Sequence, residues 1–330
     1  MEIRFERAGI HLPVLGLWLD ARKCIRGGER VFVSHAHADH IGPHDEVLLT
    51  EATSLFMRKR LPGKRQEHVL DFGARQEFQF GAETFHLTAL PAGHILGSAM
   101  AFIESRGETL LYTGDFKLRA SLAAEVTEVR RADVLIMETT FGLPQYQFPP
   151  EESVRAEIVK FCRDALASEV TPVLFGYSLG KSQEILRGLA DTRIPVMLQR
   201  DVRQMTKLYE KLGMTFPPHE VFDPETAQGR IVIAPPNSLK TMQKDALGKM
   251  RTAIITGWAL NSSCRYRSGT DAAFALSDHA DFAGLLELVT LVQPKTVYTV
   301  HGFAREFAQT LRSRGVDAVA PGWHEQLALL

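Results

Sequence analysis

Three histidines and an aspartate fall within six consecutive positions at the end of an apolar run, in the stretch VFVSHAHADHIG at residues 31–42. A β-strand would place residues 35, 37 and 39 on one face and His40 on the other. A helix would also divide the four side chains between two faces. Neither element brings all of them to one point, so the geometry favours two separate binding positions.

A strand that ends in this stretch and turns into a helix can offer its side chains to two metal ions. His35 and His37 would reach the first ion, and Asp39 and His40 the second. Imidazole and carboxylate together favour zinc, manganese or iron over calcium and magnesium. The alternative is a solvated, histidine-rich loop.

A metal pair needs further ligands, and three candidates follow apolar segments. His94 lies between glycines in LPAGHILGSAM, Asp115 ends LLYTGD, and His301 ends KTVYTVH. Each taken singly is explained as well by a turn or surface residue. Because α/β sheets build their sites at the carboxyl ends of strands, we expect these three side chains to join the cluster.

The composition is that of a globular protein, with 45% hydrophobic and 23% charged residues in 330. A net charge of −1 excludes nucleic-acid binding through overall positive charge, but it leaves a local basic patch open. Cys24, Cys162 and Cys264 form no CxxC pair, so we expect a reducing compartment and three small buried side chains. The first residues do not resemble a signal peptide, and no apolar run approaches the roughly 18 residues of a membrane helix. A cytoplasmic protein is the expectation.

The order of apolar segments predicts an α/β fold with a break near Pro149. Alternating turn signals and apolar runs predict strands at 30–34, 46–50, 99–105, 109–114 and 133–139. Helical spacing predicts a helix at 154–167, followed by a strand, a glycine-containing loop and a helix across 171–190. Later segments predict strands at 194–199, 230–236 and 252–258, and then helix, turn and strand across 282–302.

The motifs at 35–40 (HAHADH), 93–94 (GH) and 113–115 (TGD) resemble the signature of the metallo-β-lactamase fold. Those at 137–142 (METTFG), 277–281 (SDHAD) and 300–302 (VHG) resemble the three extra motifs of its β-CASP nuclease branch, which processes RNA or repairs DNA. The resemblance runs from about Gly16 to the C-terminus. It implies an αββα metallo-β-lactamase sandwich from residues 1–148 and 252–330, with an inserted α/β β-CASP domain at 149–251.

The resemblance also implies roles for individual residues. His35, His37, His94 and Asp115 would hold one metal ion, and Asp39, His40, His301 and again Asp115 the other. Two divalent transition metals (zinc, manganese or iron) would activate a shared water as hydroxide for attack on phosphorus. The catalytic residues would be Asp39, His279 as the general acid, and Glu138 as its hydrogen-bond partner.

The segment FGYSLGKSQE at 175–184 resembles the loop with which crosslink-repair DNA exonucleases of this branch hold a terminal 5′-phosphate. Ser178, Gly180 and Lys181 would bind the phosphate at a helix N-terminus. A plain helix-start turn explains the segment equally well, and its spacing is not that of a Walker A loop. His301 departs from those enzymes, which carry valine there, and matches the RNA-processing and ligase-associated members.

The chain looks most like the bacterial exonucleases of this branch that are associated with DNA ligase and helicase genes. It is therefore expected to be a metal-dependent DNA exonuclease of 5′-to-3′ polarity in repair. Its partners would be single-stranded DNA or a duplex end, a repair ligase and a helicase, and no membrane. The alternative is an endo- or exoribonuclease of the β-CASP type acting on RNA.

Two other classes fit the sequence less well. A catalytically silent scaffold would lack ligands, and none is missing from the motifs. A small-molecule hydrolase would have no reason to carry Glu138, His279 and the central segment together. Basic residues at 200, 203, 207 and 211 are spaced to share a helix face that meets phosphates, although a solvated face is the more common reason for such spacing.

Overall fold

The computed structural model describes residues 1–236, 238, 242 and 247–322, and the chain forms two compact units. The first unit runs from Met1 to Gln147 and resumes at His279, and the second is Phe148–Asp278.

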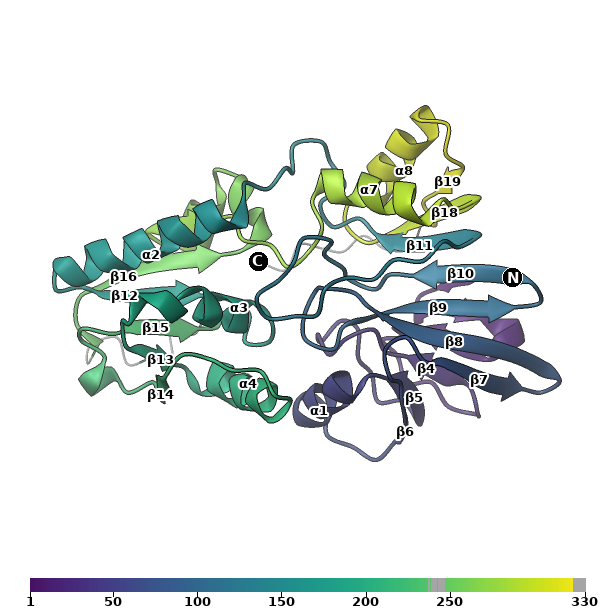
Figure 1. Cartoon of the computed structure of the whole chain (residues 1–330), viewed down its shortest axis with the longest axis horizontal. Coiled ribbons are helices and arrows are strands. Elements are labelled where there is room, and N and C mark those ends of the chain that lie inside the picture. Colours follow the sequence, from purple (N-terminus) through teal and green to yellow (C-terminus); the bar gives the residue numbers. More distant parts are fainter. Residues whose placement is uncertain (237, 239–241, 243–246, 323–330) are drawn as a thin grey trace. The chain divides into compact units, whose positions relative to one another are not determined.

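The first unit contains two β-sheets (Figure 1). One sheet has its strands in chain order: β1 (Arg4–Glu6), β2 (Gly9–Leu12), β3 (Leu17–Leu19), β4 (Arg30–Phe32), β5 (Glu46–Leu49) and β6 (Gln66–Val69). The other has the order β19-β18-β11-β10-β9-β8-β7. Its strands are β7 (Arg75–Phe80), β8 (Glu83–Pro91), β9 (Ala99–Ser105), β10 (Glu108–Tyr112), β11 (Val134–Glu138), β18 (Thr296–Val300) and β19 (Ala318–Val319).

Alternation along the strands places one apolar layer between the sheets and a second layer under helices. In β11, Val134 and Ile136 join the core shared by both sheets. Leu135 and Met137 face the other way, into a core with α7 (Phe282–Val292) and α8 (Ala304–Ser313). The helix α1 (Glu51–Arg60) lies beside β6 of the first sheet (Figure 1). The result is the expected αββα sandwich.

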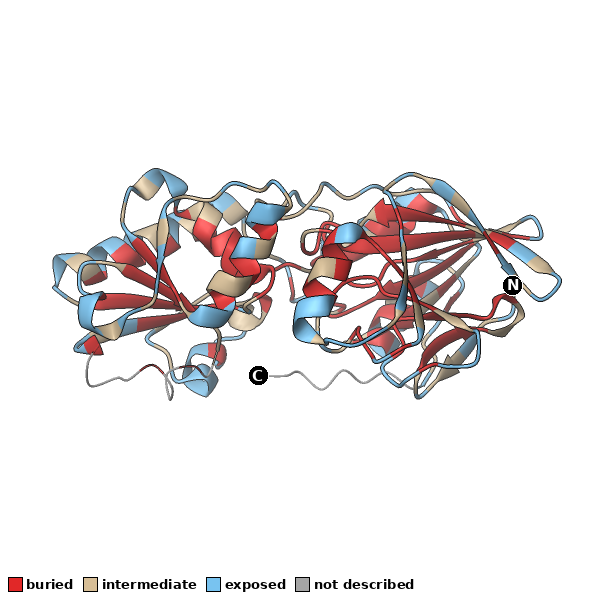
Figure 2. Cartoon of the chain, turned by 90° about the horizontal axis from the view of Figure 1, so that it is seen from below, coloured by how far each residue is buried: buried red, intermediate tan, exposed pale blue. Residues whose placement is uncertain are grey.

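The second unit is an α/β layer built on one parallel sheet, in the order β14-β13-β15-β12-β16-β17. Its strands are β12 (Thr171–Phe175), β13 (Val196–Leu198), β14 (His219–Val221), β15 (Ile231–Ala234), β16 (Met250–Ile255) and β17 (Ala272–Phe274). Its helices are α2 (Glu151–Ala167), α3 (Lys181–Gly188), α4 (Arg200–Lys211) and α6 (Cys264–Ser268). Buried side chains line both faces of this sheet. Figure 2 colours the strands of each unit mostly as buried.

Short 3₁₀ turns complete the described elements. They are η1 (Pro13–Leu15), η2 (Ala190–Thr192), η3 (Pro224–Thr226) and η5 (Gly257–Leu260). Within the described part of the chain, every helix is too short or too polar to span a lipid bilayer.

The inserted domain was expected to end at residue 251, but in the structure the second unit ends at Asp278. β16 pairs with β12, and β17 pairs with β16, so the second unit continues to Asp278. The apolar run at 252–258 predicts a strand correctly, but its composition does not say which sheet it joins. Pairing partners far apart in the chain decide that.

Two further expectations are wrong. No helix follows the SHAHADH stretch: β4 ends at Phe32, the chain makes a turn at residues 37–40, and β5 comes next. Cys24 is exposed, with its thiol donating to the carbonyl of Pro43 at 2.8 Å. Cys162 and Cys264 are buried as expected, and burial raises the pKa of the Cys162 thiol to about 12.

Candidate active site

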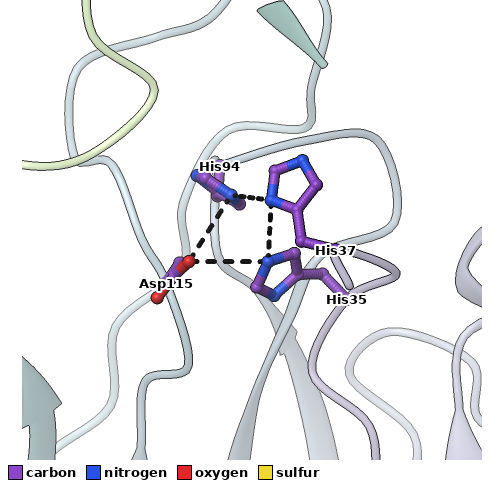
Figure 3. A group of neighbouring side chains, drawn as sticks. All are labelled: His35, His37, His94 and Asp115. Atoms are coloured by element: carbon purple, nitrogen blue, oxygen red, sulfur yellow. Dashed lines mark hydrogen bonds and ion pairs between the residues drawn. The ribbon is translucent and has the colours of Figure 1, made fainter. Parts of the chain in front are cut away.

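Four side chains of the first unit converge on one point (Figure 3). Nε2 of His35 and Nε2 of His94 each lie 3.1 Å from Nδ1 of His37. Oδ2 of Asp115 lies 3.5 Å from Nε2 of His35 and 3.8 Å from Nε2 of His94. One ligand atom from each residue falls within 4.8 Å of all the others, so the four could hold a single metal ion.

The second sheet explains why distant residues meet here. β10, β11 and β18 are parallel neighbours, so their carboxyl ends share one edge. Asp115 follows β10, Glu138 ends β11 and His301 follows β18. β8 runs in the same direction as β10, because two antiparallel pairings separate them, and His94 follows it.

A second group adjoins the first through Asp115. Nε2 of His40 is 3.3 Å from Oδ2 of Asp115 and 3.7 Å from Oδ2 of Asp39. The ring centroids of His40 and His301 are 5.9 Å apart. The same Asp115 oxygen therefore faces both groups.

The polar atoms of this cluster suit metal binding. Oδ1 of the buried Asp115 makes no hydrogen bond with any described residue. Burial opposes charge on His40, but Asp115, Asp20 and Asp39 outweigh it and hold the pKa of His40 well above its usual value. Burial and then the neighbouring His40 and His94 hold the pKa of His35 well below its usual value. One side therefore stabilises positive charge, and the other offers neutral imidazole, as metal ligands require.

Asp20 is a site residue that the sequence reading missed. Its carboxylate accepts hydrogen bonds from the Ser34 N–H (2.7 Å), the Ser34 hydroxyl (2.6 Å), Nδ1 of His40 (2.7 Å) and the Tyr112 hydroxyl (2.7 Å). The bond from Nδ1 leaves Nε2 of His40 for a metal ion. A lone aspartate after LWL carries no motif, and only the distant partners reveal its role.

Replacing Asp20 by asparagine is expected to weaken metal binding by about 10- to 100-fold, because His40 loses its charged hydrogen-bond acceptor. Metal content after titration with zinc or manganese measures the change. Asp45→Asn, at an exposed position nearby, should bind metal as the wild type does. Unchanged affinity in Asp20→Asn would show that Asp20 does not orient His40.

Glu138 and His279 form a pair beside the cluster. Nδ1 of His279 is 2.8 Å from Oε1 of Glu138. The same carboxylate accepts the Phe116 N–H at 3.0 Å and the Thr140 N–H at 3.2 Å, so these donors occupy both oxygens. Glu138 is therefore a hydrogen-bond acceptor that orients His279. The ring of His279 is 4.7 Å from that of His94 and retains 18% side-chain exposure, so a substrate can reach it.

The backbone conformation at His301 depends on the glycine that follows it, Gly302. His301 has a φ of 59°, and its carbonyl accepts the Thr139 hydroxyl at 2.6 Å. Gly302 has a φ of 56°, and a Cβ added there would lie 2.5 Å from the carbonyl oxygen of Thr139 and against the Cα of Thr140. The V-H-G motif therefore encodes a left-handed turn that fits against the end of β11.

Gly302→Ala is expected to destabilise the first unit by about 2–5 kcal/mol, the sum of left-handed strain and overpacking. Gly315→Ala is the matched control, because Gly315 also has a positive φ but nothing lies within 4 Å of its added Cβ. Chemical denaturation measures both. Equal losses in the two variants would rule out the clash at Gly302.

The proposed phosphate loop lies in the second unit, where two of its polar groups bond to side chains of α3. Nζ of Lys181 donates to Oε2 of Glu184 at 2.9 Å, and the side chain is 1% exposed. The Gly180 N–H is taken by Oε1 of Gln183 at 2.8 Å. Both groups are therefore bonded to side chains of α3, and the Lys181 ammonium is buried. The half-buried Ser178 remains a candidate.

Two stretches of the chain match known protein families. Residues 17–172 match a family model described as "Beta-lactamase superfamily domain", and residues 272–321 match "Zn-dependent metallo-hydrolase RNA specificity domain". A protein named Probable DNA ligase from Opitutus terrae is 48% identical over 330 residues, 99% of this chain and 32% of the relative.

Two further relatives are nucleases by name. The 5′ exonuclease Apollo of Rattus norvegicus is 24% identical over 88% of this chain and 54% of the relative. An RNase J-like protein of Methanocaldococcus jannaschii is 27% identical over 48% of this chain and 42% of the relative. The chain thus spans between about a third and a half of the length of these relatives.

The sandwich, the ordered motifs and these matches together define a metallo-hydrolase with a His and Asp cluster able to bind metal ions. The chain belongs to the metallo-β-lactamase fold, in the branch that carries a β-CASP domain.

Proposed function

We propose that the chain is a DNA exonuclease of 5′-to-3′ polarity that acts in repair, with Asp39, His40, His301 and Asp115 holding a second metal ion beside the first. The observation that carries the phosphodiesterase chemistry is the Glu138–His279 pair next to the cluster. Cleaving a phosphodiester needs an acid for the leaving oxygen, and this pair supplies one.

Each protein group has a distinct task in this proposal. Divalent ions held by the cluster would supply Lewis acidity, which lowers the pKa of water and stabilises charge on the phosphoryl oxygens. His279 bonds Glu138 through Nδ1, and its Nε2 would carry the proton that the leaving oxygen takes. Glu138, fixed by two backbone N–H groups, keeps that imidazole oriented.

The preference for DNA is supported by the relatives that cover most of the chain. The protein named Probable DNA ligase matches 99% of it, and the 5′ exonuclease Apollo matches 88%. The RNase J-like protein matches 48%. These names also support the 5′-to-3′ polarity and, through the first relative, a DNA ligase as a working partner.

RNA is the second candidate substrate, and one observation favours it. Residues 272–321, which include His279 and His301, match a domain named for RNA specificity. In this second hypothesis the same residues cleave RNA, so the two candidate functions differ only in whether the substrate is DNA or RNA.

Digestion of matched single-stranded DNA and RNA, each with a 5′-phosphate or 5′-hydroxyl end, tests the proposal. A 5′-labelled DNA strand should lose its label as a mononucleotide, and RNA should be cut more slowly. Faster cutting of RNA would favour the second candidate. A ladder of internal products would contradict exonuclease action.

A further inference from the structure

The helix α4 of the second unit (Figure 1) carries a row of positive charge that the proposed chemistry does not use. Its members, called the α4 stripe, are Arg200, Arg203, Lys207 and Lys211. Successive residues of a helix are about 100° apart, so the four side chains fall within an arc of about 80°. The rise of about 1.5 Å per residue spreads them over about 17 Å of the helix.

The opposite face of α4 is fixed in the core, so packing sets the direction of the stripe. The buried side chains of α4 lie between about 140° and 240° around the helix from Arg200 and are Val202, Met205, Thr206 and Tyr209. Val202 joins a core that includes side chains of β13 and β15. Nε2 of Gln183, on α3, donates to the Thr206 hydroxyl at 3.0 Å. The α4 stripe therefore faces solvent, with three exposed residues and a half-buried Arg203.

Acidic side chains of α4 leave the stripe positively charged. None of its four cationic groups forms an ion pair with a residue that the structure describes. Asp201 lies about 80° outside the arc of the stripe. Glu210 borders the arc, about 20° away, and its carboxylate is 3.9 Å from His219. The stripe is thus a continuous row of like charges.

The order of these charges opposes the stability of the helix. Each member of the stripe has a like-charged neighbour three or four residues away, and such pairs destabilise a helix. Arg200 is also the first residue of α4, where the positive end of the helix dipole disfavours a cation. A face that served only solubility would intersperse charges of both signs. A ligand of negative charge explains the stripe better than solvation does.

We propose that the α4 stripe is a docking surface for the sugar–phosphate backbone of single-stranded DNA, an inference that rests on the proposed nuclease function. A strand carries one negative charge per nucleotide, so a row of cations along a helix can contact several phosphates. Both arginine and lysine bind phosphate, and contacts of this kind carry no base information. The surface would raise the affinity for a strand of any sequence.

Binding of a 3′-fluorescein-labelled oligothymidylate to metal-loaded His279→Ala protein, measured by anisotropy, tests the surface while cleavage is slow. In that protein, replacing Arg200, Lys207 and Lys211 by glutamine should raise the Kd by about tenfold or more, since each contact is a charged pair. The slope of log Kd against log salt should fall by about 2, or about 0.7 for each phosphate contact. An oligodeoxyadenylate should lose the same amount, and a loss confined to one of the two strands would overturn backbone recognition.

A second triple variant controls for net charge. Lys160→Gln, Arg163→Gln and Lys249→Gln together remove three exposed positive charges of the same unit outside α4. The salt slope of this variant should stay near that of the parent protein. Equal changes of slope in the two triple variants would overturn the surface, because only the overall charge would then matter. Lys207→Arg with Lys211→Arg keeps the charge and should leave the Kd within about twofold.

Two further measurements separate this surface from a structural role and from a membrane. The midpoint of chemical denaturation should not fall when the stripe is replaced by glutamine, because like-charged neighbours are removed. A lower midpoint with an unchanged Kd for DNA would overturn the surface in favour of a structural role. Loss of binding to phosphatidylserine vesicles with no loss of binding to DNA would overturn it in favour of a membrane.

A small diester distinguishes the surface from the proposed function. Metal-loaded protein that keeps His279 should hydrolyse bis(p-nitrophenyl) phosphate at the wild-type rate after the stripe is replaced, because no member of the stripe belongs to the metal cluster. If the wild type binds the strand through the stripe but does not cleave it, the nuclease proposal fails and the surface stands. If the wild type cleaves DNA and the stripe variant binds it as tightly as the parent protein, the surface is overturned and the nuclease proposal stands.

Discussion

Asp115→Ala is expected to abolish nuclease activity and to lower bound metal at both positions. Oδ2 of Asp115 faces His35, His40 and His94 at 3.3–3.8 Å, so its loss removes a ligand from both groups. Metal ions contribute several kcal/mol to the transition state, which corresponds to a loss of about 10³-fold or more in rate. Metal analysis and an oligonucleotide assay measure the two effects.

Two variants show whether the loss is specific to the carboxylate. Asp115→Asn keeps the size of the side chain and should lose metal as well, whereas Asp71→Ala, at an exposed position, should behave as wild type. Circular dichroism verifies that the variants are folded. Full metal content in a folded Asp115→Asn protein would contradict the bridging role.

His279→Ala is expected to slow cleavage by about 10²- to 10⁴-fold while metal content stays near that of the wild type. In the proposed mechanism His279 transfers a proton, because it bonds Glu138 and lies beside His94 without being one of His35, His37, His94 and Asp115. The rate of DNA cleavage and the metal content of one preparation are the two measurements.

A substrate whose leaving group needs no proton tests specifically whether His279 acts as the acid. A p-nitrophenolate group leaves without protonation, so His279→Ala should slow hydrolysis of bis(p-nitrophenyl) phosphate much less than cleavage of DNA. His86→Ala is the control, because His86 pairs with Glu77 at 3.3 Å away from the site. Loss of metal in His279→Ala would show that His279 is a ligand and not the acid.

The candidate site was largely predictable because its residues follow apolar strands whose ends meet. His94, Asp115 and His301 come from β8, β10 and β18, and each is recognisable from a short motif at a strand end. The first motif was expected to divide where a strand turns into a helix, and the chain makes a turn there instead. His35 and His37 lie in one group, and His40 faces Asp39 in the other.

What could not be predicted depends on contacts between distant residues. Asp20 lies 92 residues before Tyr112 and has no motif of its own. The sequence of β16 predicts a strand but not the sheet that the strand joins. Only its pairing with β12 assigns it to the second unit. Lys181 matches a phosphate-loop pattern, and only the structure shows that its buried ammonium bonds Glu184, an i, i+3 contact.

The most direct test of the two-metal site is to restore metal stepwise to chelated protein. The metal-free protein should be inactive on 5′-phosphorylated single-stranded DNA, and zinc or manganese should restore activity up to two equivalents per chain, with the wild type binding both. Cleavage by fully metal-free protein, or restored activity in Asp115→Asn equal to that of the wild type, would contradict the site described for this chain.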